Sequence, residues 1–202
     1  MPAAYEQFLV PVVFQPFAED MAARAAALRP RRILELAAGT GVLTSRLLGA
    51  LPSAGVIATD LNEAMVAFGS TRAPGAVWRQ ADAERLPFPD ASFDTVALTL
   101  VLCTVPDPDA ALRETARVLK PGGRFLFLEH VRSEDAKLAR WQDRLHGPWY
   151  AFGHGCNCNR DTAAAIERSP LRVERLERGA IPKMPPLVKP LLQGSALAPD
   201  HR

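Results

Sequence analysis

A short apolar strand that runs directly into a glycine turn constrains the fold of this chain most. Residues 33–36 read Ile-Leu-Glu-Leu, residues 37–41 read Ala-Ala-Gly-Thr-Gly, and residues 42–48 have the composition of a helix. Glycine supplies the backbone freedom of a tight turn, and the first N–H groups of the helix face that turn at the positive end of the helix dipole. The segment predicts a binding site for a nucleotide-like ligand.

A second strand places a carboxylate beside this turn. Residues 55–60 end in Asp60, which follows Gly41 by nineteen residues. A carboxylate there can accept hydrogen bonds from both hydroxyls of a ribose. Dinucleotide-binding proteins usually carry a third glycine three residues after the second, and Thr44 occupies that position here. The pattern therefore disfavours a dinucleotide as the ligand. The alternative to any nucleotide site is a structural turn followed by a surface acid.

Further strands alternate with helices along the chain. Residues 77–82 predict a third strand that ends at Asp82, and residues 93–98 predict a fourth. A Pro-Gly-Gly turn at 121–123 precedes a fifth strand at 125–130. The unbroken apolar character of the fourth strand is typical of a parallel strand that is buried on both faces. The alternation indicates an α/β architecture.

In sequence and order these motifs resemble those of the class I S-adenosylmethionine-dependent methyltransferases. Their first motif reads acid, apolar, small, any residue, Gly, any residue, Gly, and Glu35 to Gly41 follow it, with Ala37 where the family usually has glycine. The resemblance implies a Rossmann-like fold with a seven-stranded sheet in the order 3-2-1-4-5-7-6 and helices on both faces. Strand six is expected at 171–176 and an antiparallel strand seven at 191–197.

The resemblance also implies S-adenosylmethionine as the cofactor, S-adenosylhomocysteine as its product, and a set of cofactor contacts. Asp60 would take the ribose, Asp82 the adenine amino group, and the Ala83 N–H a ring nitrogen. The full set of expected cofactor residues is Glu35, Ala37, Gly39, Thr40, Gly41, Asp60, Leu61, Met65, Asp82, Ala83 and Thr99.

Composition agrees with one enzyme-sized domain over residues 1–202. The 24 basic and 22 acidic residues give a net charge of +2, and no basic cluster marks a nucleic-acid surface. No stretch reaches 18 apolar residues, and the N-terminus has no charged and apolar leader pattern, so no stable membrane insertion is expected. Three cysteines in such a chain fit reduced thiols, and we expect a cytoplasmic protein with a small-molecule substrate.

Two segments bear on the substrate. Residues 1–28 are expected to form an N-terminal helical lid, with apolar Phe8, Val12, Phe14 and Phe17 and a strong helix former at 20–28. Residues 132–168 are expected to form a substrate cap that includes an amphipathic helix over 136–150 and a helix over 160–168 with Asn159 as its N-cap. The aromatic residues of the lid also suit an ordinary core.

A narrower resemblance covers the second half of the chain. It is similar to the methyltransferase-like thiol methyltransferases, which methylate small thiols, whereas the first 95 residues resemble bacterial small-molecule methyltransferases of unassigned substrate. The segments that carry the thiol-methyltransferase resemblance are 99–105, 128–131, 141–149, 155–162 and 192–196. The expected function is therefore methylation of a small molecule, most specifically S-methylation of a thiol. O- or N-methylation, a lipid headgroup as acceptor, and a non-catalytic cofactor-binding module are the alternatives.

Methyl transfer needs alignment and a dry pocket more than it needs a base. His130, at the end of the fifth strand, is the expected catalytic residue, as a base or a polar contact, and a structural histidine is the alternative. Cys103 lies just past the fourth strand and suits a small buried hydrophobe. His154, Cys156 and Cys158, with His146 as a fourth ligand, lack the spacing of a structural zinc site, so no metal site is expected. Paired thiols leave methylation of trivalent arsenic as a minor hypothesis.

Overall fold

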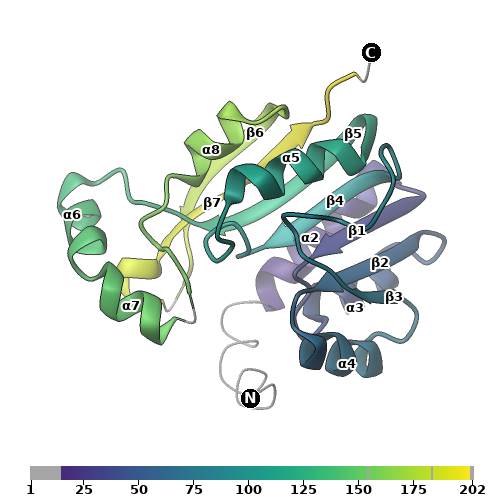
Figure 1. Cartoon of the computed structure of the whole chain (residues 1–202), viewed down its shortest axis with the longest axis horizontal. Coiled ribbons are helices and arrows are strands. Elements are labelled where there is room, and N and C mark those ends of the chain that lie inside the picture. Colours follow the sequence, from purple (N-terminus) through teal and green to yellow (C-terminus); the bar gives the residue numbers. More distant parts are fainter. Residues whose placement is uncertain (1–14, 154, 183, 201–202) are drawn as a thin grey trace.

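The computed structural model describes residues 15–153, 155–182 and 184–200, and their strands form one sheet in the order β3-β2-β1-β4-β5-β7-β6 (Figure 1). The first five strands of the chain pair in parallel, and β7 runs antiparallel to both β5 and β6. The expected topology is confirmed. The strands are β1 (Arg32–Leu36), β2 (Gly55–Asp60), β3 (Val77–Gln80), β4 (Phe93–Thr99), β5 (Leu119–His130), β6 (Arg172–Ala180) and β7 (Pro190–Leu197).

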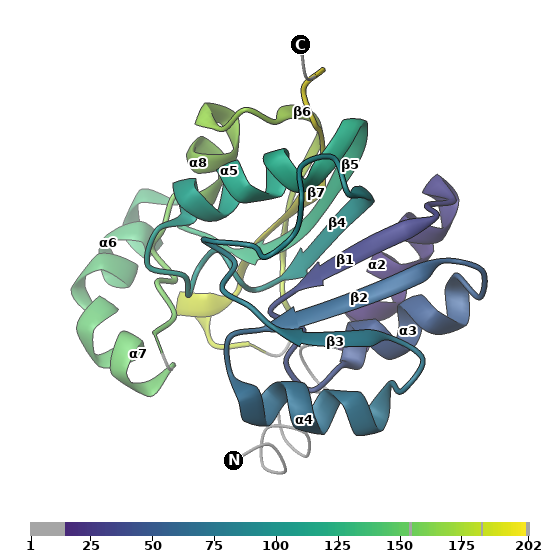
Figure 2. The same ribbon diagram turned by 45° about the vertical axis from the view of Figure 1, so that its right-hand side comes forward.

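Helices cover both faces of this sheet. The helices α2 (Gln15–Leu28) and α3 (Val42–Ala50) lie on one face, and α5 (Pro108–Val118) and α8 (Thr162–Arg168) lie on the other (Figure 2). Central strands therefore bury both sides, as the apolar run of β4 predicted, and Phe93, Phe125 and Phe127 are fully buried between sheet and helices. Of the helices described, none has both the length and the apolarity that a bilayer span requires.

The N-terminal lid is described only from Gln15 onward. Phe8, Val12 and Phe14 lie outside the described residues, whereas the expected helix over 20–28 is present as part of α2. Buried α2 residues such as Met21 and Ala25 pack against α3 and β1 in one apolar cluster. The described part of the lid therefore belongs to the core of the sheet face, and one of its residues, Ala18, reaches the cavity described below.

Three strands differ from their expected bounds. The sixth strand, expected at 171–176, is β6 over Arg172–Ala180 and so continues four residues further. The Pro-Gly-Gly segment is a bulge inside β5 and not a turn before it, because pairing with β4 moves from Phe93↔Leu119 to Thr95↔Arg124. Gly122 has φ 68, a conformation that lets the backbone loop out and rejoin the ladder. The third strand ends at Gln80, so Asp82 lies in the following loop, where it forms an isolated bridge with Arg85.

The expected single helix over 136–150 was wrong, because the structure has two helices there. These are α6 (Ala136–Arg144) and α7 (His146–Phe152), which extend from the sheet at the end where β5 finishes (Figure 1). Pro148 has no N–H to donate to a carbonyl four residues earlier, so the first helix cannot continue through it. The chain instead breaks at Leu145, with φ −98 and ψ 7.

The helix expected over 160–168 begins later, at Thr162. Its N-cap is Asp161, whose carboxylate accepts the Ala164 N–H at 3.1 Å. The expected cap, Asn159, instead donates its side-chain amide to Asp143 of α6 at 3.1 Å. Both residues suit an N-cap, and the contact with the neighbouring helix decides between them.

Candidate functional site

A cavity of about 490 Å³ opens beyond the carboxyl ends of β1, β2 and β4, a volume that suits a cofactor-sized ligand. In α/β sheets the order of strands reverses at this position, and ligands bind there. Ten of the expected cofactor residues line this cavity: Glu35, Ala37, Gly39, Thr40, Asp60, Leu61, Met65, Asp82, Ala83 and Thr99. Gly41 and His130, the other two expected site residues, do not line it.

The turn after β1 has the backbone that its glycines predict. Gly39 and Gly41 have φ 56 and φ 79, and Ala37 adopts φ 48, which is strained for a residue with a Cβ. A Cβ on Gly41 would lie 3.0 Å from the Trp78 ring, whereas one on Gly39 would meet no atom within 4 Å. Gly41 therefore serves the packing of the turn against β3, and Gly39 leaves open space on the cavity side.

Asp60 fixes the turn from the end of β2. Its two carboxylate oxygens accept the Gly39 N–H and the Asn62 N–H, each at 2.8 Å. The same carboxylate lines the cavity, so its remaining lone pairs face a ligand. Asp60 thus links the glycine turn, the next loop and the cavity wall through one side chain.

Glu35 is a buried carboxyl at the floor of the same cavity. It is 2 % exposed and accepts a hydrogen bond from the Thr44 hydroxyl at 2.6 Å. Burial, helped by the negative charge of Asp60, raises the pKa of Glu35 to about 8, although the Thr44 hydrogen bond acts to lower it. The sequence motif predicts an acid here but not its protonation, which depends on the depth of burial.

Asp82 and Ala83 form the opposite wall of the cavity. The Asp82 carboxylate accepts the Glu84 N–H at 2.9 Å and caps its own loop. The Ala83 N–H has no hydrogen-bond partner among the described residues, although it borders the cavity. A polar carboxylate next to a free N–H donor is the arrangement that an adenine edge requires.

Glu129 is a structural residue of this region that sequence reasoning missed. It is fully buried and accepts the N–H groups of Val101, Leu102 and Cys103 at 2.7, 2.8 and 3.1 Å. Burial raises the pKa of Glu129 to about 7, although the three backbone N–H groups act to lower it. The carboxylate holds the turn after β4 in place beside the cavity. An acid within the apolar run Phe-Leu-Phe-Leu-Glu-His was the available signal.

His130 lies behind the cavity wall, in a cluster with two cysteines. It is 6 % exposed, its Nδ1 is 3.7 Å from the Cys156 Sγ, and its Nε2 is buried with no partner among the described residues. Cys103 and Cys156 are also buried, and a hydrogen bond from the Cys103 thiol lowers the pKa of Cys156. Leu100, which has φ 58, both lines the cavity and packs against the cluster of the cysteines.

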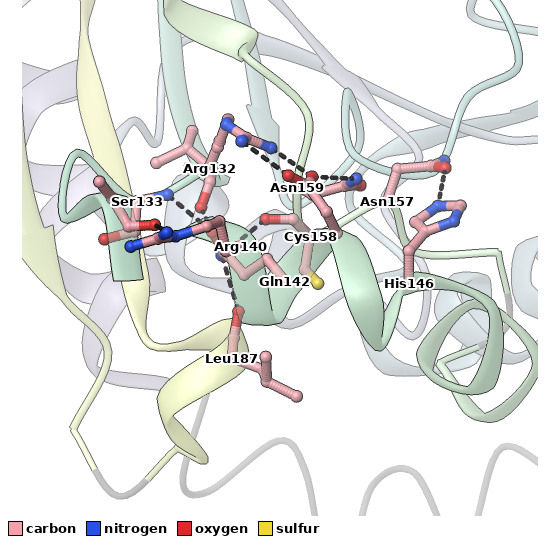
Figure 3. A network of polar contacts seen from close by, with 12 residues as sticks. Arg132, Ser133, Arg140, Gln142, His146, Asn157, Cys158, Asn159 and Leu187 are labelled. Carbon is pink, nitrogen blue, oxygen red and sulfur yellow. Dashed lines mark hydrogen bonds and ion pairs between the residues drawn. The ribbon is translucent and has the colours of Figure 1, made fainter. Parts of the chain in front are cut away.

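A buried amide, Gln142 of α6, joins several segments around the cap (Figure 3). Its Nε2 contacts the carbonyl oxygens of Val131, Cys158 and Leu187 at 3.2, 2.9 and 2.9 Å, and its Oε1 accepts the Ser133 N–H at 2.8 Å. These partners come from the end of β5, the loop before α8 and the 3₁₀ helix η2 (Pro186–Val188). Gln142 therefore ties three segments to α6.

Of the four residues weighed above as metal ligands, His146, Cys156 and Cys158 are described, and they do not form one group. His154 lies outside the described residues. The Nε2 of His146 contacts the Asn157 Oδ1 at 2.8 Å (Figure 3), so this ring is engaged by an amide. Cys156 instead joins Cys103 and His130, a grouping that local spacing could not reveal because its members are far apart in the sequence.

Comparison with known proteins agrees with this geometry. A family described as "Methyltransferase domain" matches residues 34–127, which include the glycine turn, Asp60 and Asp82. The ubiquinone/menaquinone biosynthesis C-methyltransferase UbiE of Saccharophagus degradans is 40% identical over 121 residues, which are 55% of this chain and 48% of that protein. The human thiol S-methyltransferase TMT1A is 39% identical over 109 residues, 54% of this chain and 45% of that protein. The chain thus spans about half the length of the curated relatives it matches.

Solved structures extend the similarity over nearly the whole fold. A putative methyltransferase from Bacillus halodurans superposes with a TM-score of 0.73 at 18% identity, covering 90% of this chain and 98% of that one. The cyclase SpnF superposes with a TM-score of 0.72 at 18% identity, covering 94% and 83%. The cyclase shows that this fold alone does not fix the reaction. The sheet order, the matched domain and these neighbours place the chain among the proteins with the Rossmann-like class I methyltransferase fold.

Proposed function

We propose that this chain is an S-adenosylmethionine-dependent methyltransferase whose acceptor is a small, largely apolar thiol. The observation that carries the cofactor assignment is the cavity at the strand ends, where Asp60, the Gly39 turn and the Asp82–Ala83 loop converge. The methyltransferase relatives that match the chain support the same assignment. S-adenosylmethionine supplies an activated methyl group on a sulfonium.

The residues of the cavity suit the polar parts of this cofactor. The Asp60 carboxylate, already oriented by two backbone N–H groups, would accept the ribose hydroxyls. The Asp82 carboxylate and the Ala83 N–H would take the adenine edge, and Leu61 and Met65 would flank the ring. The open space at Gly39 would let the methionine portion approach the backbone of the turn. Glu35 would lie below the positively charged part of the cofactor.

We expect the acceptor beside the turn after β4, where the cavity lining is mainly apolar and also includes Thr99 and Thr104. Leu100, Val101 and Val105 line the cavity there, on the turn that Glu129 holds and that the cap loop contacts. Apolar walls with few polar anchors favour a small apolar acceptor and exclude water from the displacement. His130 does not line the cavity, and we propose it as a polar contact for an acceptor that reaches past Leu100, since its buried Nε2 has no partner among the described residues. The similarity to a thiol S-methyltransferase supports sulfur as the atom that is methylated.

The thiolate is the nucleophilic form of a thiol, so the protein needs only to orient an acceptor that has lost its proton. The residues of the chain would align the acceptor with the methyl carbon, and no protein base is required for the displacement. Rates at subsaturating thiol should therefore rise with pH as the thiolate fraction of the acceptor increases.

A panel of acceptors tests the proposal. Purified protein is mixed with S-adenosylmethionine and alkyl thiols, aryl thiols, phenols, amines or phospholipids, and release of S-adenosylhomocysteine is followed from pH 6 to 10. Thiol-dependent release that increases with thiolate fraction supports the proposal. Release only with phenols, amines or lipids would assign O- or N-methylation or a headgroup acceptor. Cofactor binding with no release for any acceptor would assign a non-catalytic binding module.

A further inference from the structure

Two thiols and an imidazole meet in the interior from three separate segments. Cys103 lies on the turn after β4, His130 ends β5, and Cys156 lies in the loop between α7 and α8. One ligand atom from each lies within 4.8 Å of the others, and the three residues are 1 %, 6 % and 5 % exposed. Within the part of the chain that the structure describes, this is the grouping of three His, Cys, Asp or Glu side chains that could hold a metal ion.

The spacing of these atoms suits a tetrahedral centre. Zinc binds sulfur at ~2.3 Å and imidazole nitrogen at ~2.0 Å, so two such ligands on a tetrahedral ion lie ~3.6 Å apart. The Cys156 Sγ and the His130 Nδ1 are 3.7 Å apart. These two donors therefore already stand at about the separation that zinc imposes, and the ligand atom of Cys103 lies within 4.8 Å of both.

The backbone around the thiols is held by bonds between the two loops that carry them. The Cys103 carbonyl accepts the Asn157 N–H at 2.7 Å and the Asn157 side-chain amide at 3.1 Å. The Arg160 guanidinium donates to the Leu102 and Val105 carbonyls, the latter at 2.8 Å. These bonds join the segment of Cys103 to that of Cys156 without using either thiol, which preorganises the site. The Cys103 thiol donates to the Leu100 carbonyl at 3.5 Å, and binding a metal would replace this bond.

We propose that Cys103, Cys156 and His130 form a binding site for one Zn²⁺ ion. Zn²⁺ would replace the two thiol protons, which pass to solvent, and the two thiolates would balance its charge in a buried setting. Thiolate and imidazole donors select zinc over the hard cations Mg²⁺ and Ca²⁺. Three protein ligands leave a fourth coordination position, as in zinc sites that bind a water or a substrate.

The fourth position has a natural occupant in a thiol. This assignment of the fourth ligand rests on the proposed function. Leu100 lines the cavity and also packs against the cysteines, so an acceptor thiol that passed Leu100 would meet the metal. A thiol that coordinates zinc loses its proton and binds as the thiolate. The metal site itself does not depend on thiol turnover and can be measured separately.

The test measures zinc directly. Full-length reduced protein is freed of metal, incubated with ZnCl₂ and desalted. Bound zinc is then quantified by mass spectrometry, and affinity is measured by competition with a chromophoric chelator. We expect about one zinc per chain, with affinity at least tenfold weaker in Cys103→Ser, Cys156→Ser and His130→Ala. Cys158→Ser is the matched control. Cys158 is a buried free thiol two residues after Cys156, and it does not belong to the group of three metal-binding candidates.

Two further measurements distinguish loss of the metal site from loss of the fold. Thermal unfolding identifies any variant that has lost its fold, and the Co²⁺-substituted protein should show thiolate-to-metal charge-transfer absorption that weakens in each cluster variant but not in Cys158→Ser. Absence of zinc from folded, reduced protein, or equal zinc in the cluster variants and the control, would overturn the proposal. If metal-free protein methylates thiols and binds no zinc, the proposed zinc site is wrong and the proposed thiol methylation is supported. If zinc binds and no thiol is methylated, the reverse holds.

Discussion

Glu35→Gln is expected to change how the stability of the protein depends on pH. The carboxyl is buried, and its pKa of about 8 compares with an ordinary value of 4.5. Between these values the unfolded chain loses the proton and the folded chain keeps it, so the free energy of unfolding falls as pH rises. At 1.36 kcal/mol per pH unit, the loss between pH 4.5 and 8 amounts to about 5 kcal/mol. Glutamine cannot ionise and keeps an acceptor for the Thr44 hydroxyl.

Urea unfolding of both proteins from pH 5 to 8 provides the measurement. The variant should match the original protein near pH 5 and exceed its free energy of unfolding progressively towards pH 8. Parallel pH dependences for the two proteins would refute the assignment of a protonated Glu35. A second reading follows from the positive charge of the cofactor, which favours the carboxylate. Calorimetry in two buffers at pH 7 should show proton release on S-adenosylmethionine binding that Glu35→Gln abolishes.

Three other substitutions test the cofactor site, the glycine turn and the attachment of the cap. Asp60→Ala should weaken S-adenosylmethionine binding roughly 10- to 150-fold by calorimetry, since hydrogen bonds to a charged acceptor contribute about 1.5 to 3 kcal/mol. The control is Asp90→Ala, which removes an exposed carboxylate outside the cavity and should leave binding unchanged. Equal affinity in the two variants would remove Asp60 from the site. Ala37→Gly should raise the free energy of unfolding by about 0.5 to 1 kcal/mol, because glycine adopts φ 48 without strain, and a loss of stability would contradict this. Gln142→Ala should lower the free energy of unfolding in urea by roughly 3 kcal/mol, because it removes the buried amide contacts. The control Arg140→Ala, at an exposed position on the same helix, should lower it by less than about 0.5 kcal/mol. Similar losses in the two variants would mean that the amide does not anchor the cap.

The sequence predicted most of the sheet and the cofactor wall because both depend on local patterns. A few consecutive residues are enough to identify the apolar run of β4, the glycine turn and the acid at the end of β2. Parallel strands bring their carboxyl ends to one edge, so residues that follow different strands, such as Asp60 and Asp82, converge without further information. Strand order and the antiparallel β7 came from the family resemblance and were confirmed.

The errors and omissions arise where distant contacts decide. Asn159 and Asp161 both suit an N-cap, and only the position of Asp143 shows that Asn159 is used elsewhere. The break between α6 and α7 is the exception, because Pro148 was a local signal for it that the expectation of one helix over 136–150 did not use. The grouping of Cys103, His130 and Cys156 requires the fold of the cap onto the sheet, which no local spacing encodes.

The fate of a labelled methyl group shows directly which atom of the acceptor is methylated. The protein is incubated with S-adenosylmethionine that carries an isotopic label in its methyl group and with an aryl thiol, and the products are identified by mass spectrometry. We expect the label on the acceptor sulfur as a methyl thioether, with one S-adenosylhomocysteine formed for each product. Label that stays on S-adenosylmethionine, or that moves only to oxygen, nitrogen or carbon acceptors when these are supplied, would contradict this expectation.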